Sequence, residues 1–166
     1  MNVLTSIIWT VVCVLCQVLV FRHLSLAGGI VLFYVYAMIK IPVEWNRSLQ
    51  ILYGFIVGFM LDMFCNTPGM HALACTTVMW LRIPIIHMFI VADEIKTGVP
   101  DSSKLSFSVF IRYTASVILL LSVLLYFIEA FTVYNWVTII AKVTISALLT
   151  FSVVLAMEML STKRKN

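Results

Sequence analysis

The chain has 166 residues, of which 63% are hydrophobic and only 11% are charged. A water-soluble domain carries about 25% charged residues, so this composition excludes a soluble protein and indicates an integral membrane protein. The net charge of +4 does not indicate a nucleic-acid partner, because the excess of basic residues in cytoplasmic loops accounts for a balance of this size.

Six apolar stretches follow one another along the chain, each close to the ~20 residues that a helix needs to cross a bilayer. They are continuous, unlike the alternating segments of a membrane β-barrel, so we predict helices. The predicted spans cover residues 3–21, 26–41, 49–64, 70–91, 105–131 and 133–160. The predicted fold is all-α, a single bundle of six transmembrane helices that forms one domain over residues 1–166.

The first stretch is uncharged, and no small-residue cleavage site follows it, so we predict a retained span and not a signal peptide. The second and third stretches are short, since about 16 residues give a helix of about 24 Å against a hydrocarbon core of about 30 Å. We expect Pro42 to end the second span. We expect Thr67 to cap the fourth span, with Pro68 at its first helical position.

Basic residues between the predicted spans and at their ends indicate the orientation, because cytoplasmic loops hold an excess of lysine and arginine. If six helices cross and both termini are cytoplasmic, Arg22 is the only basic loop residue outside. The cytoplasmic side then holds Lys40, Arg47, Lys96, Lys104 and the terminal Lys163, Arg164 and Lys165. We therefore predict this topology, and we expect the terminal cluster to attract anionic lipid headgroups.

The third stretch carries Gly54, Gly58 and Asp62 at every fourth position, so these residues share one face of a helix. Glycines at this spacing let another backbone approach closely, and a carboxylate facing hydrocarbon is costly. We expect this face, together with Gly69, to pack against another helix of the chain or against the span of a partner. We expect Asp62 to tie the turn at residues 66–69 and not to act as a proton site.

Further charged residues lie within the later stretches. Glu129 and Lys142 flank the last predicted turn at similar depth, so we predict an ion pair; the alternative is that Glu129 reaches the outer interface alone. Arg82 and Arg112 fall in the cytoplasmic halves of their spans. We expect both side chains to reach interfacial water, helped at Arg82 by a kink at Pro84. Arg82 and Asp62 differ too much in depth to be partners.

The sequence contains no zinc-protease, hydrolase or phosphate-loop motif, and its acidic residues are too scattered to place two carboxylates together. Cys13, Cys16 and Cys75 lie in apolar stretches, where free cysteine is a small buried side chain, and a bridge between Cys65 and Cys75 is not expected. His71 is expected at the outer interface. We therefore predict no enzyme, no cofactor and no metal site.

The run Gly54-Phe55-x-x-Gly58-x-x-x-Asp62, followed by a short turn, Gly69 and Leu73-Ala74, resembles the signature of the bacterial rod shape-determining protein MreD family. The size, the six apolar segments, the short second span ending in a proline and the polar loop of residues 93–106 are also similar. The resemblance implies a non-catalytic scaffold of the cell-wall elongation complex in the bacterial inner membrane. It also implies the single-span protein MreC as partner and, through MreC, MreB, RodA and a penicillin-binding transpeptidase.

Two alternatives remain open. MreD-like proteins are similar in architecture to the substrate-binding membrane subunits of energy-coupling-factor vitamin transporters, which meet their transport module through an alanine pair in the first span. The first span here lacks such a pair. A channel needs hydroxyl groups along one helix face, but such groups in spans more often bond within or between helices. The nearest approach to a hydroxyl-lined face is formed by Thr138, Thr144, Ser146 and Thr150.

Overall fold

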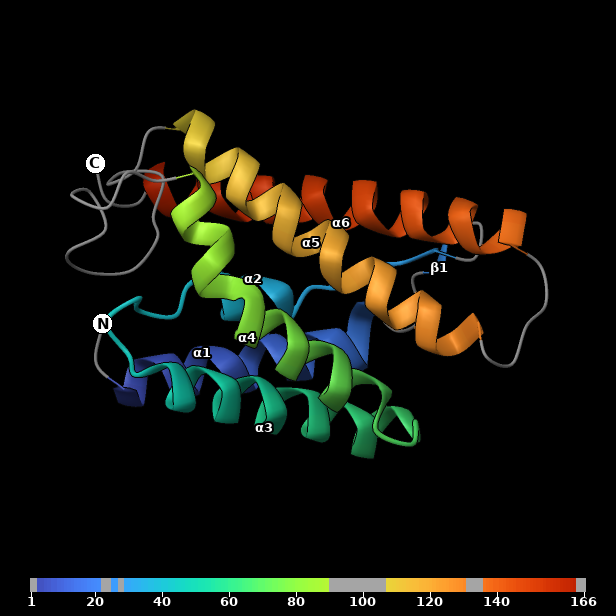
Figure 1. Ribbon diagram of the computed structural model, residues 1–166, viewed down its shortest axis with the longest axis horizontal. Coiled ribbons are helices and arrows are strands. Elements are labelled where there is room, and N and C mark those ends of the chain that lie inside the picture. The colour runs from blue at the N-terminus through green and yellow to red at the C-terminus, as the bar shows by residue number, and fades with distance from the viewer. Residues whose placement is uncertain (1–2, 22–24, 27–28, 90–106, 131–135, 164–166) are drawn as a thin grey trace.

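The computed structural model describes residues 3–21, 25–26, 29–89, 107–130 and 136–163 (Figure 1). The helices are α1 (Val3–Cys16), continued by the π-helical turn η1 (Gln17–Phe21), then α2 (Val35–Ile39), α3 (Arg47–Cys65), α4 (Met70–Phe89), α5 (Phe107–Ala130) and α6 (Trp136–Lys163). Strands β1 (Ser25–Leu26) and β2 (Gly29–Ile30) form a short antiparallel pair.

Four described helices are long and apolar enough to cross a membrane: α3, α4, and most of α5 and α6. The apolar part of the first helix, Ser6–Val20, is shorter. The protein is thus a helical multi-pass membrane protein. Five of the six predicted spans agree with these helices to within three residues at each end. The predicted polar loop at residues 93–106 lies outside the described residues.

The long helices run along a common direction (Figure 1). α1 and α3 begin at one end of the bundle, which we call the proximal end, and α4 and α6 finish there. The opposite, distal end holds the strand pair, the end of α3 and the start of α6. A hydrogen bond between the hydroxyl groups of Thr10 and Tyr53 joins α1 to α3.

The second predicted span, residues 26–41, is not a continuous helix. The chain instead forms the strand pair and then the five-residue α2, and we call residues 29–41 the central segment. It runs from the distal end through the interior of the bundle towards the start of α3 (Figure 1). Residues 31–39 and Ile41 are buried. Non-helical backbone is stable at this depth only where the protein itself satisfies its polar groups.

Candidate functional site

The distal half of the central segment is held by Gln17, the first residue of η1. Its Nε2 donates to the carbonyl of Val31 at 2.8 Å, and its Oε1 accepts from the amide of Phe33 at 2.6 Å. The side-chain amide of Gln17 therefore supplies both the donor and the acceptor that the backbone of a neighbouring strand would supply. The sequence offered a signal for this contact, since an uncharged amide inside an apolar run must find partners.

Hydroxyl groups of α5 and α6 bond the same half of the segment. The amide of Ile30 donates to Tyr126 Oη at 3.2 Å, and the amide of Leu32 donates to Thr150 Oγ1 at 2.9 Å. Ser146 Oγ donates to the carbonyl of Ile30. Ser146 and Thr150, considered above as lining for a water path, thus hold the backbone of the central segment.

Arg82 holds the proximal half of the segment. Its side chain is only 1% exposed. Nη2 donates to the carbonyls of Ile39 at 3.2 Å and Ile41 at 2.5 Å. Nε donates to Tyr113 Oη and Nη1 to Gln50 Oε1, both at 2.9 Å. The expectation that Arg82 reaches interfacial water is therefore wrong, because the carbonyls of a non-helical segment lie close enough to bind its guanidinium.

Gln50 extends this cluster to the turn that leads into α3. Its Nε2 donates to the carbonyl of Trp45 at 2.8 Å and to that of Val43 at 3.4 Å, while its Oε1 accepts from Arg82. Arg112, the other arginine expected at a membrane surface, is exposed. Buried amide and guanidinium groups with several partners stabilise a single arrangement, since each lost bond leaves an unpaired group in a low dielectric.

A second buried charge fixes the end of α2. Lys40 Nζ lies 2.6 Å from Glu158 Oε2 and 2.9 Å from Oε1, and Tyr36 Oη donates to Oε2 at 3.4 Å. Glu158 is 1% exposed and the Lys40 side chain 13%. Lys40, predicted on the cytoplasmic side at the end of the second span, is thus bound to α6 within the bundle.

Asp62, near the end of α3, caps the start of α4. Its Oδ2 accepts from the amide of Ala72 at 2.8 Å, and its Oδ1 accepts from the amide of His71 at 3.0 Å. Oδ1 also accepts from Thr67 Oγ1 at 2.5 Å and lies 3.0 Å from His71 Nδ1. The first amides of a helix lack partners within it, and a carboxylate is a strong acceptor for them. The prediction that Asp62 ties this turn is confirmed.

The predicted cap at Thr67 and Pro68 is wrong in detail. α4 begins at Met70, after both residues, and the Thr67 hydroxyl bonds to Asp62 and His71. Asp62, from the preceding helix, therefore replaces the local cap. His71 is half-buried at the distal end, where its ring meets the ring of Tyr34 edge-on with centroids 6.1 Å apart.

Gly54 and Gly58 pack against α4 of the same chain, which is one of the two arrangements predicted for them. A Cβ at Gly58 would lie 2.5 Å from Cα and 2.6 Å from N of Ala72, and one at Gly54 would lie 2.6 Å from Cγ of Met79. Gly69 differs. A Cβ there would meet no atom within 4 Å, but its φ is +78°. Gly69 serves the turn and does not take part in the α3–α4 interface, so the prediction that it packs within this chain is wrong.

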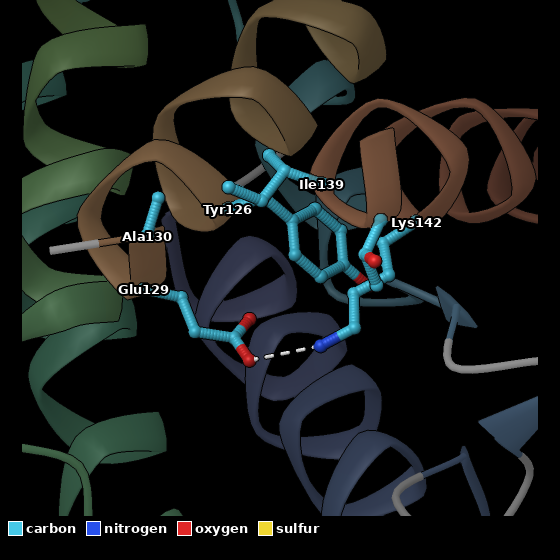
Figure 2. A pocket seen from close by; sticks show the side chains of 6 residues that line it. Tyr126, Glu129, Ala130, Ile139 and Lys142 are labelled. Atoms are coloured by element: carbon cyan, nitrogen blue, oxygen red, sulfur yellow. Dashed lines mark hydrogen bonds and ion pairs between the residues drawn. The ribbon is translucent and has the colours of Figure 1, made fainter. Parts of the chain in front are cut away.

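Glu129 and Lys142 lie together at the distal end, as their depths indicated. Lys142 Nζ donates to Glu129 Oε1 at 3.3 Å, across a depression also lined by Tyr126 and Ile139 (Figure 2). The depression has a volume of about 10 Å³, which is room for about one water molecule. The pair joins α5 to α6.

The side chains of Lys163, Arg164 and Lys165 lie outside the described residues. Cys13, Cys16, Cys65 and Cys75 form no disulfide bond. Within the described part of the chain, no three His, Cys, Asp or Glu side chains lie close enough together to hold a metal ion.

Comparisons of the chain with protein-family models, with curated proteins and with solved structures found no match. Arg82, Gln17 and Gln50 are all engaged with backbone groups of the chain itself, and Asp62 with the start of α4. These contacts hold the fold together.

Replacing Asp62 tests the cap. Asp62→Ala removes the acceptor of two helix amides, the Thr67 hydroxyl and the His71 ring. We expect it to lower the free energy of unfolding by about 2–4 kcal/mol, measured by denaturant unfolding in detergent. Thr67→Val, which removes one of these bonds, is the matched control and should cost about 1 kcal/mol. Equal stabilities of Asp62→Ala and the parent protein would contradict the cap.

Proposed function

We propose that this protein is a non-catalytic scaffold of the MreD type, which maintains cell shape as part of the cell-wall elongation complex in the bacterial inner membrane. The observation that carries the proposal is the role of Gly54, Gly58 and Asp62. These residues carry the family resemblance, and they join α3 to α4 by close packing and a cap. A motif that packs two helices closely together is compatible with a protein that functions by binding other proteins through its helix surfaces.

The proposal includes an orientation. Arg47 is the first residue of α3 and Arg112 lies in the second turn of α5, both towards the proximal end, while Lys142 near the distal end is paired with Glu129. The positive-inside rule then puts the proximal end in the cytoplasm, with both termini on that side. The central segment makes the second of six crossings in this arrangement. Its non-helical backbone is compatible with a crossing because protein side chains surround it.

The partners in this proposal are MreC, through its single span, and, through MreC, MreB, RodA and a penicillin-binding transpeptidase. Membrane lipids cover the remaining apolar faces. Large apolar side chains such as Ile8, Phe59 and Leu148 are exposed on three different helices, so the bundle offers several surfaces for spans of other proteins.

A substrate-binding subunit of an energy-coupling-factor transporter is the second candidate. The central segment favours it, since broken crossings with buried polar residues form the substrate sites of many transporters. The bonds of Gln17, Arg82 and Gln50 to the chain's own backbone argue for the scaffold, because those groups are already occupied.

Co-purification distinguishes the two candidates. A tagged copy of the chain, extracted from its native membrane in mild detergent, should recover a single-span coiled-coil protein together with cell-wall synthesis proteins. An unrelated tagged multi-pass protein expressed at the same level is the control for non-specific recovery. Recovery of transport ATPases in place of cell-wall proteins would contradict the scaffold and support the transporter.

A further inference from the structure

α4 contains a proline in its interior. Pro84 has no amide hydrogen, so the carbonyl of Trp80, four residues earlier, loses its partner within the helix. Proline at such a position also bends a helix, because its ring meets that same carbonyl. In Figure 1, α4 starts beside the end of α3 and finishes near the start of α5.

The orphaned carbonyl is bonded by Arg47, the first residue of α3. Arg47 Nη2 donates to the carbonyl of Trp80 at 3.3 Å, and its Cζ lies 5.3 Å from the centre of the Trp80 ring. The same guanidinium thus replaces the missing hydrogen bond and stacks on the side chain of the residue that lost it. Arg47 and Pro84 are both exposed, and Trp80 is 50% exposed.

Two side-chain contacts join α4 to α3 in the four residues before Pro84. Arg82 Nη1 donates to Gln50 Oε1 inside the bundle, and Arg47 Nη2 donates to the carbonyl of Trp80 on the exposed side. Earlier in α4, the glycine contacts at Ala72 and Met79 and the Asp62 cap attach the helix to α3. The exposed contact therefore joins the proline-containing stretch of α4 to the first residue of α3.

We propose that Pro84 is a hinge in α4 and that Arg47 is its latch. The latch holds the proximal end of α4, from Ile85 to Phe89, at one angle to α3. Loss of the guanidinium lets the angle of that end vary while Ile86 stays buried in the core, and restoring the helical hydrogen bond at residue 84 makes the latch unnecessary. This conformational device rests on the geometry alone and does not depend on the proposed function.

Distances between spin labels test the hinge. Nitroxides at Met63→Cys on α3 and Met88→Cys on α4 report the angle of the proximal end, since these side chains are 71% and 82% exposed. The background replaces the native cysteines with alanine at Cys13, Cys16, Cys65 and Cys75. In lipid nanodiscs, we expect Arg47→Ala to widen the distance distribution about twofold.

Two further variants separate a latch from a general effect of charge or folding. Arg112→Ala removes an exposed arginine of α5 and should leave the distribution unchanged. Pro84→Ala restores an amide for the Trp80 carbonyl, so it should narrow the distribution and cancel the effect of Arg47→Ala. An unchanged width in Arg47→Ala, or equal widening with and without Pro84, would overturn the proposal.

Discussion

Arg82→Ala is expected to be among the most destabilising single substitutions in this protein. It leaves the carbonyls of Ile39 and Ile41 without their arginine donor, and it removes the shared partner of Gln50 and Tyr113. Each buried polar group that loses its only partner costs about 1–3 kcal/mol, so we expect a loss of at least about 3 kcal/mol. Unfolding in detergent and the yield of monodisperse protein both measure this effect.

Two further variants show which property of Arg82 accounts for the loss of stability in Arg82→Ala. Arg82→Lys keeps the charge and three donors but not the planar fork, so we expect it to recover about half of the lost stability. Arg112→Ala removes an exposed arginine and should change stability by less than about 0.5 kcal/mol. If Arg82→Ala were as stable as Arg112→Ala, Arg82 would not hold the central segment.

Gly58→Leu is expected to prevent the α3–α4 pair from forming. Its Cβ alone would fall on backbone atoms of Ala72 and on the carbonyl oxygen of His71, which cannot move aside as a flexible side chain can. Gly54 faces the flexible Met79 side chain as well as the carbonyl of Cys75. We therefore expect Gly58→Ala to lower the free energy of unfolding more than Gly54→Ala does, by about 1 kcal/mol or more. Thermal unfolding in detergent measures the stabilities of the two variants.

Phe59→Leu is the matched control, since Phe59 is exposed on another face of the same helix. It should leave the melting temperature within about 2 °C of the parent protein. A Gly58→Leu variant that melts with the parent protein would show that the close approach of the two helices is not required.

The sequence predicted what depends on local pattern and on the spacing of residues along a helix. Hydropathy located the long helices, because crossing a bilayer demands apolar length. The four-residue spacing of Gly54, Gly58 and Asp62 placed them on one face, and antiparallel geometry brought Glu129 to Lys142. These inferences need no knowledge of which helices are neighbours beyond the next one in the chain.

The central segment and Arg82 could not be predicted in this way. An apolar run such as residues 26–41 looks the same whether it faces lipid as a helix or lies inside the bundle. The difference depends on Gln17, Arg82 and Thr150, which come from three distant parts of the sequence. Their amide, guanidinium and hydroxyl groups take the place of the hydrogen bonds that a helix would make internally.

Depletion of the protein in its own cell, with cell shape and vitamin uptake followed together, tests the proposed function most directly. The scaffold predicts that rod-shaped cells become round while the uptake of water-soluble vitamins stays at the level of undepleted cells. Cells that keep their rod shape while the uptake of a vitamin falls would contradict the scaffold and establish the transporter.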